Sequence, residues 1–334
     1  MMEQLWYGKS GWRWWLAPFA LLFAIISGAR RYAYRRGWRK AYRAGVPVIV
    51  VGNISVGGNG KTPVVIWLVE QLQARGFKPG VVSRGYGGKA PHYPYRLDAA
   101  STTAQAGDEP VLIARRCGCP VVVAPKRADA VRLLEQSGEV DIIITDDGLQ
   151  HYALARDIEL VVVDGARRFG NRCLLPMGPL REPVTRLKRV DAIICNGGEP
   201  GKGEYPMSLI ADGPRRVRDD APLAEPLPRA VDALAGIGHP PRFFATLTGL
   251  GYELQQSVGY ADHHPFDRDE LVARFGQRPL LMTEKDAVKC RPFARDNWWY
   301  LPVSAQLPAS LLDTLLQKLA QAKSATVAAA GARE

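Results

Sequence analysis

The sequence predicts an α/β fold, in which a parallel sheet with helices on both faces is joined to a second, smaller α/β domain. Short apolar runs alternate with helical segments along most of the 334 residues, which is the order that parallel sheets need. A glycine-rich turn joins the first of these runs to a helix, and an apolar stretch precedes them both. We expect an N-terminal helix in residues 1–29, a first domain in residues 30–166 and a second domain in residues 167–334.

The N-terminal stretch has the composition of a membrane-associated segment. Residues 14–29 carry no charge, aromatic residues lead into them, and a basic run over residues 30–43 follows. A cleaved signal peptide would need small residues where Arg30 and Arg31 stand, and a spanning helix needs about 17–25 apolar residues. We therefore favour a helix that lies in the membrane surface, with a short span second and a buried core helix last. Either membrane arrangement leaves the basic run on the cytoplasmic side.

The net charge and the cysteine content indicate which partners and which cellular compartment to expect. The net charge of +11 suggests an anionic partner such as a nucleotide, a phospholipid surface, a nucleic acid or an acidic substrate. The five cysteines form no C-x-x-C pair, so we expect reduced thiols in the cytosol, without a disulfide framework or a zinc site.

A phosphate-binding loop of the P-loop NTPase type follows the first predicted strand, residues 48–51. Its backbone N–H groups would surround a phosphate, and the helix predicted at residues 63–75 would add its N-terminal dipole. Lys61 can reach the outer phosphates, and the Thr62 hydroxyl can bind Mg²⁺. A glycine-rich hairpin beside a lysine is the alternative. The expected nucleotide contacts are Ser55, which replaces the usual glycine, and Val56, Gly57, Gly58, Asn59, Gly60, Lys61 and Thr62.

Further elements complete the first domain. Strands are predicted at residues 78–83, 120–124, 141–145 and 158–163, helices at 107–116 and 128–136, and a surface loop at 90–107. Ligands of such sheets gather at the carboxyl ends of the strands. One strand ends there in Asp146 and Asp147, where nucleotide-using enzymes place a metal-binding carboxylate; the alternative is a pair of turn-forming aspartates. His151, which follows closely, is a weaker candidate for the site.

The second half continues the alternation less regularly. Residues 167–189 look like a connection plus a loop that carries Arg181 and Glu182. Strands are predicted at residues 191–196, 207–211, 231–236, 255–260, 280–283 and 298–303, and helices at 242–250, 267–275 and 310–320. The turn at residues 236–240 resembles a second phosphate cradle but lacks a Lys-Ser/Thr pair, so we interpret it as a sharp turn at the start of a helix. The crevice between the two units is the natural active site.

If a phosphoryl group is transferred, a residue must position or deprotonate the acceptor hydroxyl. Asp108, at a strand-to-helix turn, is the candidate base, and His263 or His264 could hold and polarise its carboxylate. Asp108 could instead be only a helix cap, and the histidines could be only polar loop residues. The residues alone leave these alternatives open.

Taken together, the motifs resemble those of the tetraacyldisaccharide 4'-kinase family of lipid A biosynthesis. The resemblance covers nearly the whole chain. It rests on GNISVGGNGKTP (52–63), SRGYGG (83–88), GDEP (107–110), DDGLQH (146–151), LLPMGPLRE (174–182), DHH (262–264) and TEKDAVK (283–289). The serine at position 55 is similar to what this family carries.

The resemblance implies a monotopic enzyme on the cytoplasmic face of the Gram-negative inner membrane. It would transfer the γ-phosphoryl group of ATP, with Mg²⁺, to the 4'-hydroxyl of a tetraacyldisaccharide 1-phosphate, a lipid A precursor. Two domains on a narrow linker would close around the nucleotide. The implied catalytic residues are Asp108, His263 (with His264 as the alternative partner) and Lys61. The residues implied at the metal and phosphates are Thr62, Asp146, Asp147 and Glu182, and those implied to line the site are His151 and Arg181.

Two other functions share some of these features. A membrane-associated P-loop ATPase switch without a small-molecule acceptor would use the loop and the acidic strand end, but would not need Asp108 and His263 beside an acceptor. A nucleic-acid-dependent ATPase would explain the positive charge, yet that charge clusters beside an apolar helix rather than in an aromatic-studded groove. We therefore expect the lipid precursor and the membrane surface as partners, no nucleic acid, and a monomer.

Overall fold

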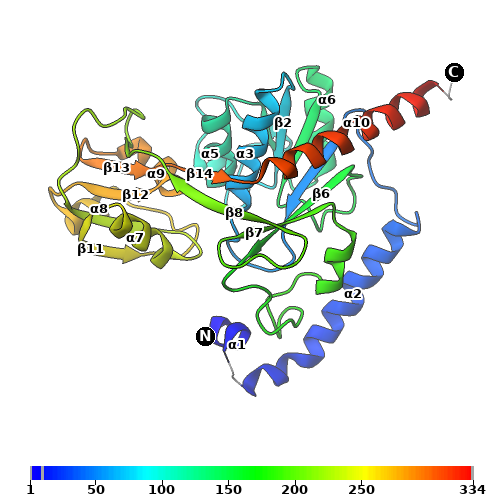
Figure 1. Ribbon diagram of the computed structural model, residues 1–334, viewed down its shortest axis with the longest axis horizontal. Coiled ribbons are helices and arrows are strands. Elements are labelled where there is room, and N and C mark those ends of the chain that lie inside the picture. Colours follow the sequence, from blue (N-terminus) through cyan, green and yellow to red (C-terminus); the bar gives the residue numbers. More distant parts are fainter. Residues whose placement is uncertain (1, 9–10, 332–334) are drawn as a thin grey trace.

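The computed structural model describes residues 2–8 and 11–331, and two sheets organise them (Figure 1). The order of strands across the larger sheet is β14 (Val303–Gln306), β8 (Glu204–Ala211), β7 (Ala192–Asn196), β6 (Ile158–Asp164), β1 (Val48–Gly52), β5 (Ile142–Asp146), β2 (Pro79–Ser83), β4 (Val121–Val123) and β3 (Tyr95–Arg96). Its strands are parallel except at the edges, where β14 and β3 run antiparallel to their neighbours.

Helices cover both faces of this sheet, because side chains alternate along each strand. On one face, Ile49 and Val51 belong to a core built with α3 (Lys61–Gln73), α5 (Asp108–Cys117) and α10 (Ala309–Gly331). On the other, Val48 and Val50 belong to a core built with α6 (Arg127–Ser137) and the 3-10 helix η2 (Val184–Arg189). The central strands β1 and β5 are consequently buried along their whole length.

The smaller sheet forms a second α/β unit. Its strands, in order, are β11 (Glu253–Gly259), β10 (Ala230–Ala235), β12 (Leu280–Thr283), β13 (Trp298–Leu301) and the antiparallel edge β9 (Arg215–Arg216). One face is covered by α7 (Pro240–Gly249). The other is covered by α8 (Arg268–Phe275), α9 (Glu284–Cys290) and η3 (Arg291–Phe293). The predicted fold class, a P-loop-type parallel sheet with a second, smaller α/β domain, is thus confirmed.

Two adjacent strands connect the units (Figure 1). β8 leads out of the larger sheet, and β14 returns beside it in antiparallel pairing. Pro302 separates β13 from β14, so the single strand predicted at residues 298–303 is two strands in different sheets. The second unit accordingly spans residues 212–302, which differs from the division at residue 166 predicted from the sequence. An apolar run predicts a strand, but it does not indicate which sheet that strand joins.

Short elements account for the remaining differences. The predicted loop at residues 90–107 contains β3 and a single helical turn, α4 (Thr103–Ala106). α9 follows β12 directly where no helix was predicted, because it has only seven residues and periodicity needs a longer window.

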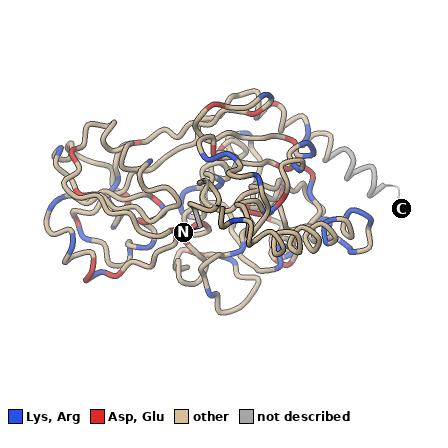
Figure 2. The backbone as a smooth tube through the Cα atoms, turned by 90° about the horizontal axis from the view of Figure 1, so that it is seen from below, with Lys and Arg blue, Asp and Glu red and all other residues tan. Residues whose placement is uncertain are grey.

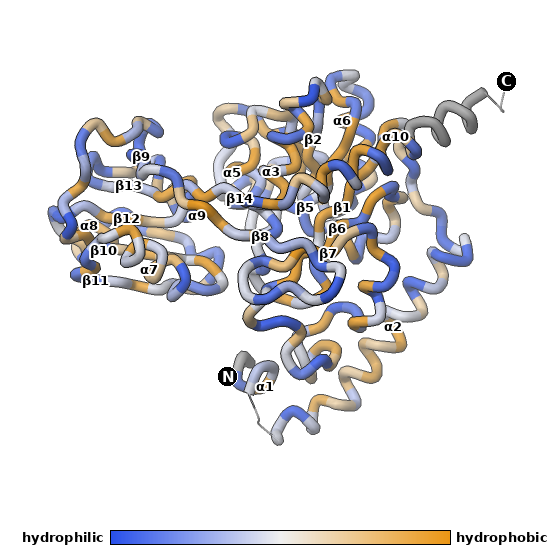
Figure 3. Tube along the Cα trace, viewed as in Figure 1, coloured by the Kyte–Doolittle hydropathy of each residue, from blue (hydrophilic) through white to orange (hydrophobic). Residues whose placement is uncertain are grey.

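The N-terminal segment extends away from the two sheets. η1 (Gly11–Leu16) and α2 (Ala17–Arg35) form one helical stretch of 25 residues that is long and apolar enough to cross a membrane, and 6% of its apolar window is buried. Apolar residues run along α2 (Figure 3), and basic residues gather at its C-terminal end (Figure 2). Both ends are tied to the first domain. Trp6 in α1 (Met2–Tyr7) donates from Nε1 to the Pro176 carbonyl at 2.9 Å, and Arg31 pairs with Glu182 at 3.3 Å.

Burial predicts which isoleucines hold the first domain together. Ile144 in β5 is fully buried, whereas Ile210 in β8 of the same sheet is 47% exposed. Ile144→Ala should lower the free energy of unfolding by about 2–5 kcal/mol, because it removes packed methyl groups and leaves a cavity. The matched control Ile210→Ala should cost about 1 kcal/mol or less. Urea denaturation of both variants measures this, and equal losses would contradict the described core.

Candidate active site

Strand ends from both domains meet at one cleft of about 1620 Å³. Its walls include the loop after β1, Asp146 at the end of β5 and Asn196 at the end of β7. From the second domain come His263, after β11, and Lys285, after β12. Since the carboxyl ends of parallel strands are where α/β proteins bind ligands, both sheets direct their binding edges into the same space.

The loop after β1 has the conformation that an anion cradle needs. Gly57 and Gly60 have φ angles of 102° and 89°, which side chains disfavour. Ser55, in the place of the usual glycine, is buried and accepts a hydrogen bond from Asn59 Nδ2 at 2.9 Å. Asn196 Nδ2 donates to the Asn59 carbonyl at 3.0 Å. The serine therefore fixes the loop from within, and α3 begins directly after it at Lys61.

Two aspartates of different character lie beside the loop. Asp147 is the more accessible: Lys61 Nζ lies 3.7 Å from its Oδ1, and Arg181 Nη1 donates to both carboxylate oxygens at 2.9 and 3.0 Å. Asp146 is 2% exposed, and within the described part of the chain its Oδ1 has no hydrogen-bond partner. Burial raises the pKa of Asp146 to about 7. An unpaired buried carboxylate oxygen is costly unless a cation compensates it.

Glu182 and His151 are held by the protein itself. Glu182 Oε1 accepts from Gln150 Nε2 at 2.9 Å, and its Oε2 accepts from the Tyr152 hydroxyl at 2.5 Å. Arg31 and Arg186 each lie 3.3 Å from the same Oε2. His151 Nε2 accepts the backbone N–H of Arg127 at 3.2 Å. Burial and the surrounding arginines lower the pKa of His151 to about 4, so its ring is neutral.

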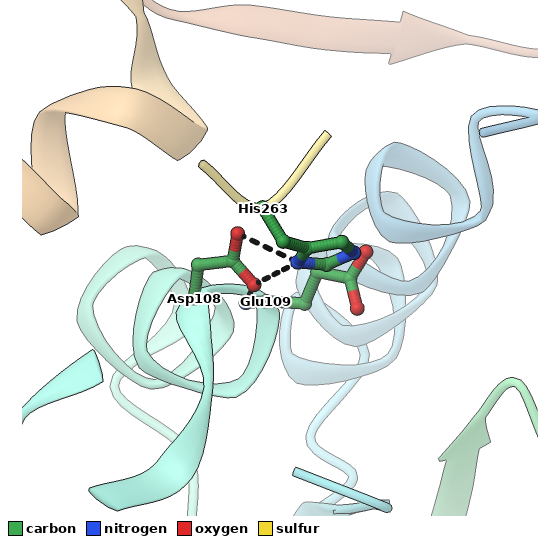
Figure 4. Close-up of side chains that lie close together, drawn as sticks. All are labelled: Asp108, Glu109 and His263. Carbon is green, nitrogen blue, oxygen red and sulfur yellow. Dashed lines mark hydrogen bonds and ion pairs between the residues drawn. The ribbon is translucent and has the colours of Figure 1, made fainter. Parts of the chain in front are cut away.

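Asp108 and His263, which come from the two domains, lie side by side (Figure 4). Asp108 is the first residue of α5 and is 4% exposed, and its two carboxylate oxygens lie 2.9 and 3.0 Å from His263 Nδ1. Burial alone would raise the pKa of Asp108, but the His263 hydrogen bond and the Lys285 charge outweigh it and hold this pKa below its ordinary value. The hydrogen bond to Asp108 raises the pKa of His263 above its ordinary value. The carboxylate and the imidazole thus stabilise each other's charged forms.

His264 is directed elsewhere. Its ring packs against Tyr260 and Phe266, with centroids 4.7 and 5.2 Å apart. The backbone turns between the two histidines, because His263 has a φ angle of 62°. Such left-handed conformations of non-glycine residues cluster at functional sites. Of the two alternatives left open by the sequence, the structure brings His263 to Asp108.

Lys285 is a site residue that the sequence reasoning missed. Its Nζ lies 3.0 Å from Glu109 Oε1, 3.0 Å from Asp262 Oδ1, 3.7 Å from Asp108 Oδ2 and 3.4 Å from His263 Nε2. Asp108, Glu109 and His263 lie close enough together to hold a metal ion. The Lys285 ammonium already supplies a cation among these groups. The available signal was a lysine between two acidic residues directly after a predicted strand.

The second domain also touches the phosphate loop. A side chain added at Gly238 would place its Cβ 3.2 Å from the Gly58 nitrogen and 3.4 Å from the Gly58 Cα. Arg242 Nη2, in α7, donates at 3.1 Å to Oδ1 of Asn196, the residue that holds the Asn59 carbonyl of the loop. The glycine turn at residues 236–240 therefore packs its backbone against the phosphate loop.

Comparison with known proteins identifies the family. The profile of the family described as Tetraacyldisaccharide-1-P 4'-kinase matches residues 12–320. The chain belongs to this family. Tetraacyldisaccharide 4'-kinases from Aeromonas salmonicida (strain A449) and Aeromonas hydrophila are 91% and 88% identical to it over 319 residues, which is 96% of this chain and 96% of each relative. One from Tolumonas auensis is 62% identical over 96% of this chain and 97% of its own length.

A solved structure supports the same assignment. The crystal structure of the family member LpxK from Aquifex aeolicus, an "apo" form in complex with ATP, covers 92% of this chain and 99% of its own. The TM-score is 0.76 and the sequence identity 27%. The predictions of an ATP-using kinase, of this family and of a lipid A precursor as its substrate are therefore confirmed.

The contact between the two glycine turns predicts a selective effect on nucleotide binding. Gly238→Ala should raise the KM for ATP about five- to hundredfold, since overpacking costs about 1–3 kcal/mol and the added methyl group would push the second domain off the phosphate loop. Gly249→Ala, also in the second domain, meets nothing within 4 Å and should leave the KM unchanged. Steady-state kinetics of the two variants decide, and an unchanged KM in Gly238→Ala would show that the turn does not close on the loop.

Proposed function

We propose that the enzyme uses this cleft to transfer the γ-phosphoryl group of ATP to the 4'-hydroxyl of a tetraacyldisaccharide 1-phosphate, with Asp108 as the base. The observation that carries the proposal is that the phosphate loop and His263 line one cleft, and that His263 is hydrogen-bonded to the buried Asp108 carboxylate directly behind it. The residues that would bind phosphate and the pair that would accept the proton are therefore close enough to act on the same two ligands.

The phosphate loop would bind the nucleotide through its backbone. Residues 55–60 present N–H groups, and the N-terminus of α3 favours negative charge. Lys61 and Arg181 now share Asp147 between them. An incoming triphosphate would bind the same two cations, Lys61 and Arg181, and their charge would neutralise negative charge on the transferred group. His151, being neutral, would line the site without adding charge.

A metal ion fits beside Asp146. Its unpaired buried oxygen and the Thr62 hydroxyl at the start of α3 are oxygen donors of the kind that Mg²⁺ prefers. When bound, Mg²⁺ supplies charge neutralisation at the nucleotide phosphates. Asp147 would join as a further ligand once its two cations turn to the phosphates. Glu182, by contrast, already accepts hydrogen bonds at both oxygens, and we assign it to anchoring α2 through Arg31.

Asp108 would act on the acceptor. Its carboxylate takes the proton from the 4'-hydroxyl while the sugar oxygen forms a bond to the γ-phosphorus and the bond from that phosphorus to the β–γ bridging oxygen breaks. The leaving group is ADP. His263 keeps the carboxylate oriented and ionised before the transfer, because it hydrogen-bonds the charged form.

The lipid would enter from α2. Phe23, Ile26 and Arg30 line the same cleft as the phosphate loop, although they belong to the apolar N-terminal helix. We propose that this helix lies in the cytoplasmic face of the inner membrane, with its basic end against anionic headgroups, and that the enzyme acts as a monomer. An ATPase switch shares the loop, but it would not require an apolar helix to form a wall of the nucleotide cleft.

The role of Asp108 predicts a large loss of turnover. Asp108→Asn should lower kcat for lipid phosphorylation about 10²- to 10⁴-fold with the KM for ATP unchanged, whereas the exposed control Asp313→Asn should have no effect. The assay follows ATP consumption and phosphate incorporation with and without detergent-dispersed lipid A precursor. Near-normal turnover in a folded Asp108→Asn protein would remove the base from the mechanism. ATP hydrolysis with unmodified lipid would favour the switch.

The same pair predicts a pH dependence. The pKa of Asp108 is lowered, so its carboxylate is ionised throughout the range in which His263 titrates, and the pKa of His263 lies above its ordinary value of 6.5. Below that pKa, the charged ring donates a stronger hydrogen bond and makes the carboxylate a weaker base. The value of kcat should therefore rise as the pH increases through the pKa of His263. The rise should be absent in His263→Gln, and the same rise in that variant would assign it to another group.

The apolar helix predicts membrane attachment. Deleting residues 1–29 should move the protein from the membrane to the soluble fraction. Replacing Leu22 and Ile26, which are 54% and 60% exposed, by glutamine should do so in part and should leave the contact between Trp6 and Pro176 in place. Fractionation of cell lysates followed by immunoblotting measures this. If the deleted protein remained wholly in the membrane fraction, another surface would have to hold it there.

A further inference from the structure

We propose that Lys285 is a positioning residue that selects the tautomer of His263 and holds the Asp108–His263 pair together across the cleft. The proposal rests on the proposed role of Asp108 as the base. It adds a residue from the second domain that would act on the carboxylate through the histidine.

The fold directs Lys285 toward this pair. It is the second residue of α9, whose first turn is capped by the Thr283 hydroxyl accepting the Asp286 N–H at 3.2 Å. The side chain is 16% exposed and lies among groups from both domains, namely Asp108 and Glu109 from α5 and Asp262 and His263 from the loop after β11. An ammonium group in this place attracts carboxylates of both domains and so holds the domains together.

The ammonium group also determines how His263 is protonated. Lys285 Nζ can only donate hydrogen bonds, so His263 Nε2, 3.4 Å away, must offer its lone pair. A neutral imidazole then carries its proton on Nδ1, which is the nitrogen that faces Asp108. The histidine therefore donates to the carboxylate as a neutral ring, and Asp108 stays a stronger base than it would be beside an imidazolium.

Without Lys285, the surrounding charge would favour another protonation state of His263. Asp108, Glu109 and Asp262 would then face His263. Lys289, a more distant cation that also acts on Asp108, is itself paired with Asp286 at 2.9 Å. Tyr86, on the other side of the ring at a centroid distance of 5.1 Å, adds no charge. His263 Nε2 lies 3.8 Å from Asp262 Oδ2, so a proton on Nε2 would be stabilised there.

The helix that carries Lys285 has a second, independent attachment. Glu284, one residue earlier, pairs with Arg116 of α5 at 3.0 Å, and Ala287 and Cys290 of α9 are buried in the second domain. Removing the Lys285 charge therefore leaves α9 packed. Lys285→Met keeps the length and apolar stem of the side chain, and Lys285→Arg keeps a cationic donor.

The tautomer can be measured directly. In full-length protein with ¹⁵N-labelled histidine in detergent micelles at pH 8, with His263 assigned from the missing signals of His263→Gln, we expect a proton on Nδ1 alone. In Lys285→Met we expect a second proton on Nε2 besides the one on Nδ1, together with a kcat that is about 10- to 100-fold lower and a KM for ATP within about twofold. Lys285→Arg should restore the Nδ1 tautomer and part of kcat.

An unchanged Nδ1 tautomer in Lys285→Met would overturn the proposal, whatever the rate. So would a wild-type ring protonated on Nε2 alone. These readings do not depend on turnover, so they are distinguishable from a failure of Asp108 as the base, which Asp108→Asn would reveal by retaining activity with the tautomer in place.

Discussion

The hydrogen bond between Asp108 and His263 is the contact on which the rest of this site depends. Its two partners come from different domains, and His263 Nδ1 lies 2.9 and 3.0 Å from the two carboxylate oxygens, within ordinary hydrogen-bond distance of both. The carboxylate is buried, so an unpartnered state would be costly. Bringing the second domain to α5 is therefore what makes this aspartate an ionised group of defined orientation.

The topology permits that approach and limits its direction. Only the adjacent strands β8 and β14 pass between the two sheets in the described residues, and they pair with each other. The two domains then touch at two places. The backbones of Gly58 and Gly238 approach each other at one, and Lys285 pairs with Glu109 at the other. Closing this cleft around nucleotide phosphates would exclude water from them and would strengthen every electrostatic interaction inside it.

Local sequence signals were sufficient for most strands of the first domain and for many of the residues that line the cleft. The strand–glycine–lysine–helix order predicted the phosphate loop because its requirements are local, and Asp146 was placed by the strand that it ends. The division of the chain could not be predicted in the same way. β7 and β8 extend the first sheet beyond residue 166, β14 joins it by pairing with β8 across the whole second unit, and Pro302 is a one-residue signal. Lys285 was missed for a related reason, since its partners are 22 to 177 residues away in the chain.

The choice between His263 and His264 shows most clearly what local sequence signals cannot predict. The two residues are adjacent and chemically identical, and only the left-handed backbone at His263 decides which ring faces α5. A double-mutant cycle on kcat tests directly whether Asp108 and His263 act as one unit. The account predicts that Asp108→Ala combined with His263→Ala is no slower than Asp108→Ala alone. If the two losses multiplied, the histidine would act independently of the carboxylate, and the central contact would have no part in the reaction.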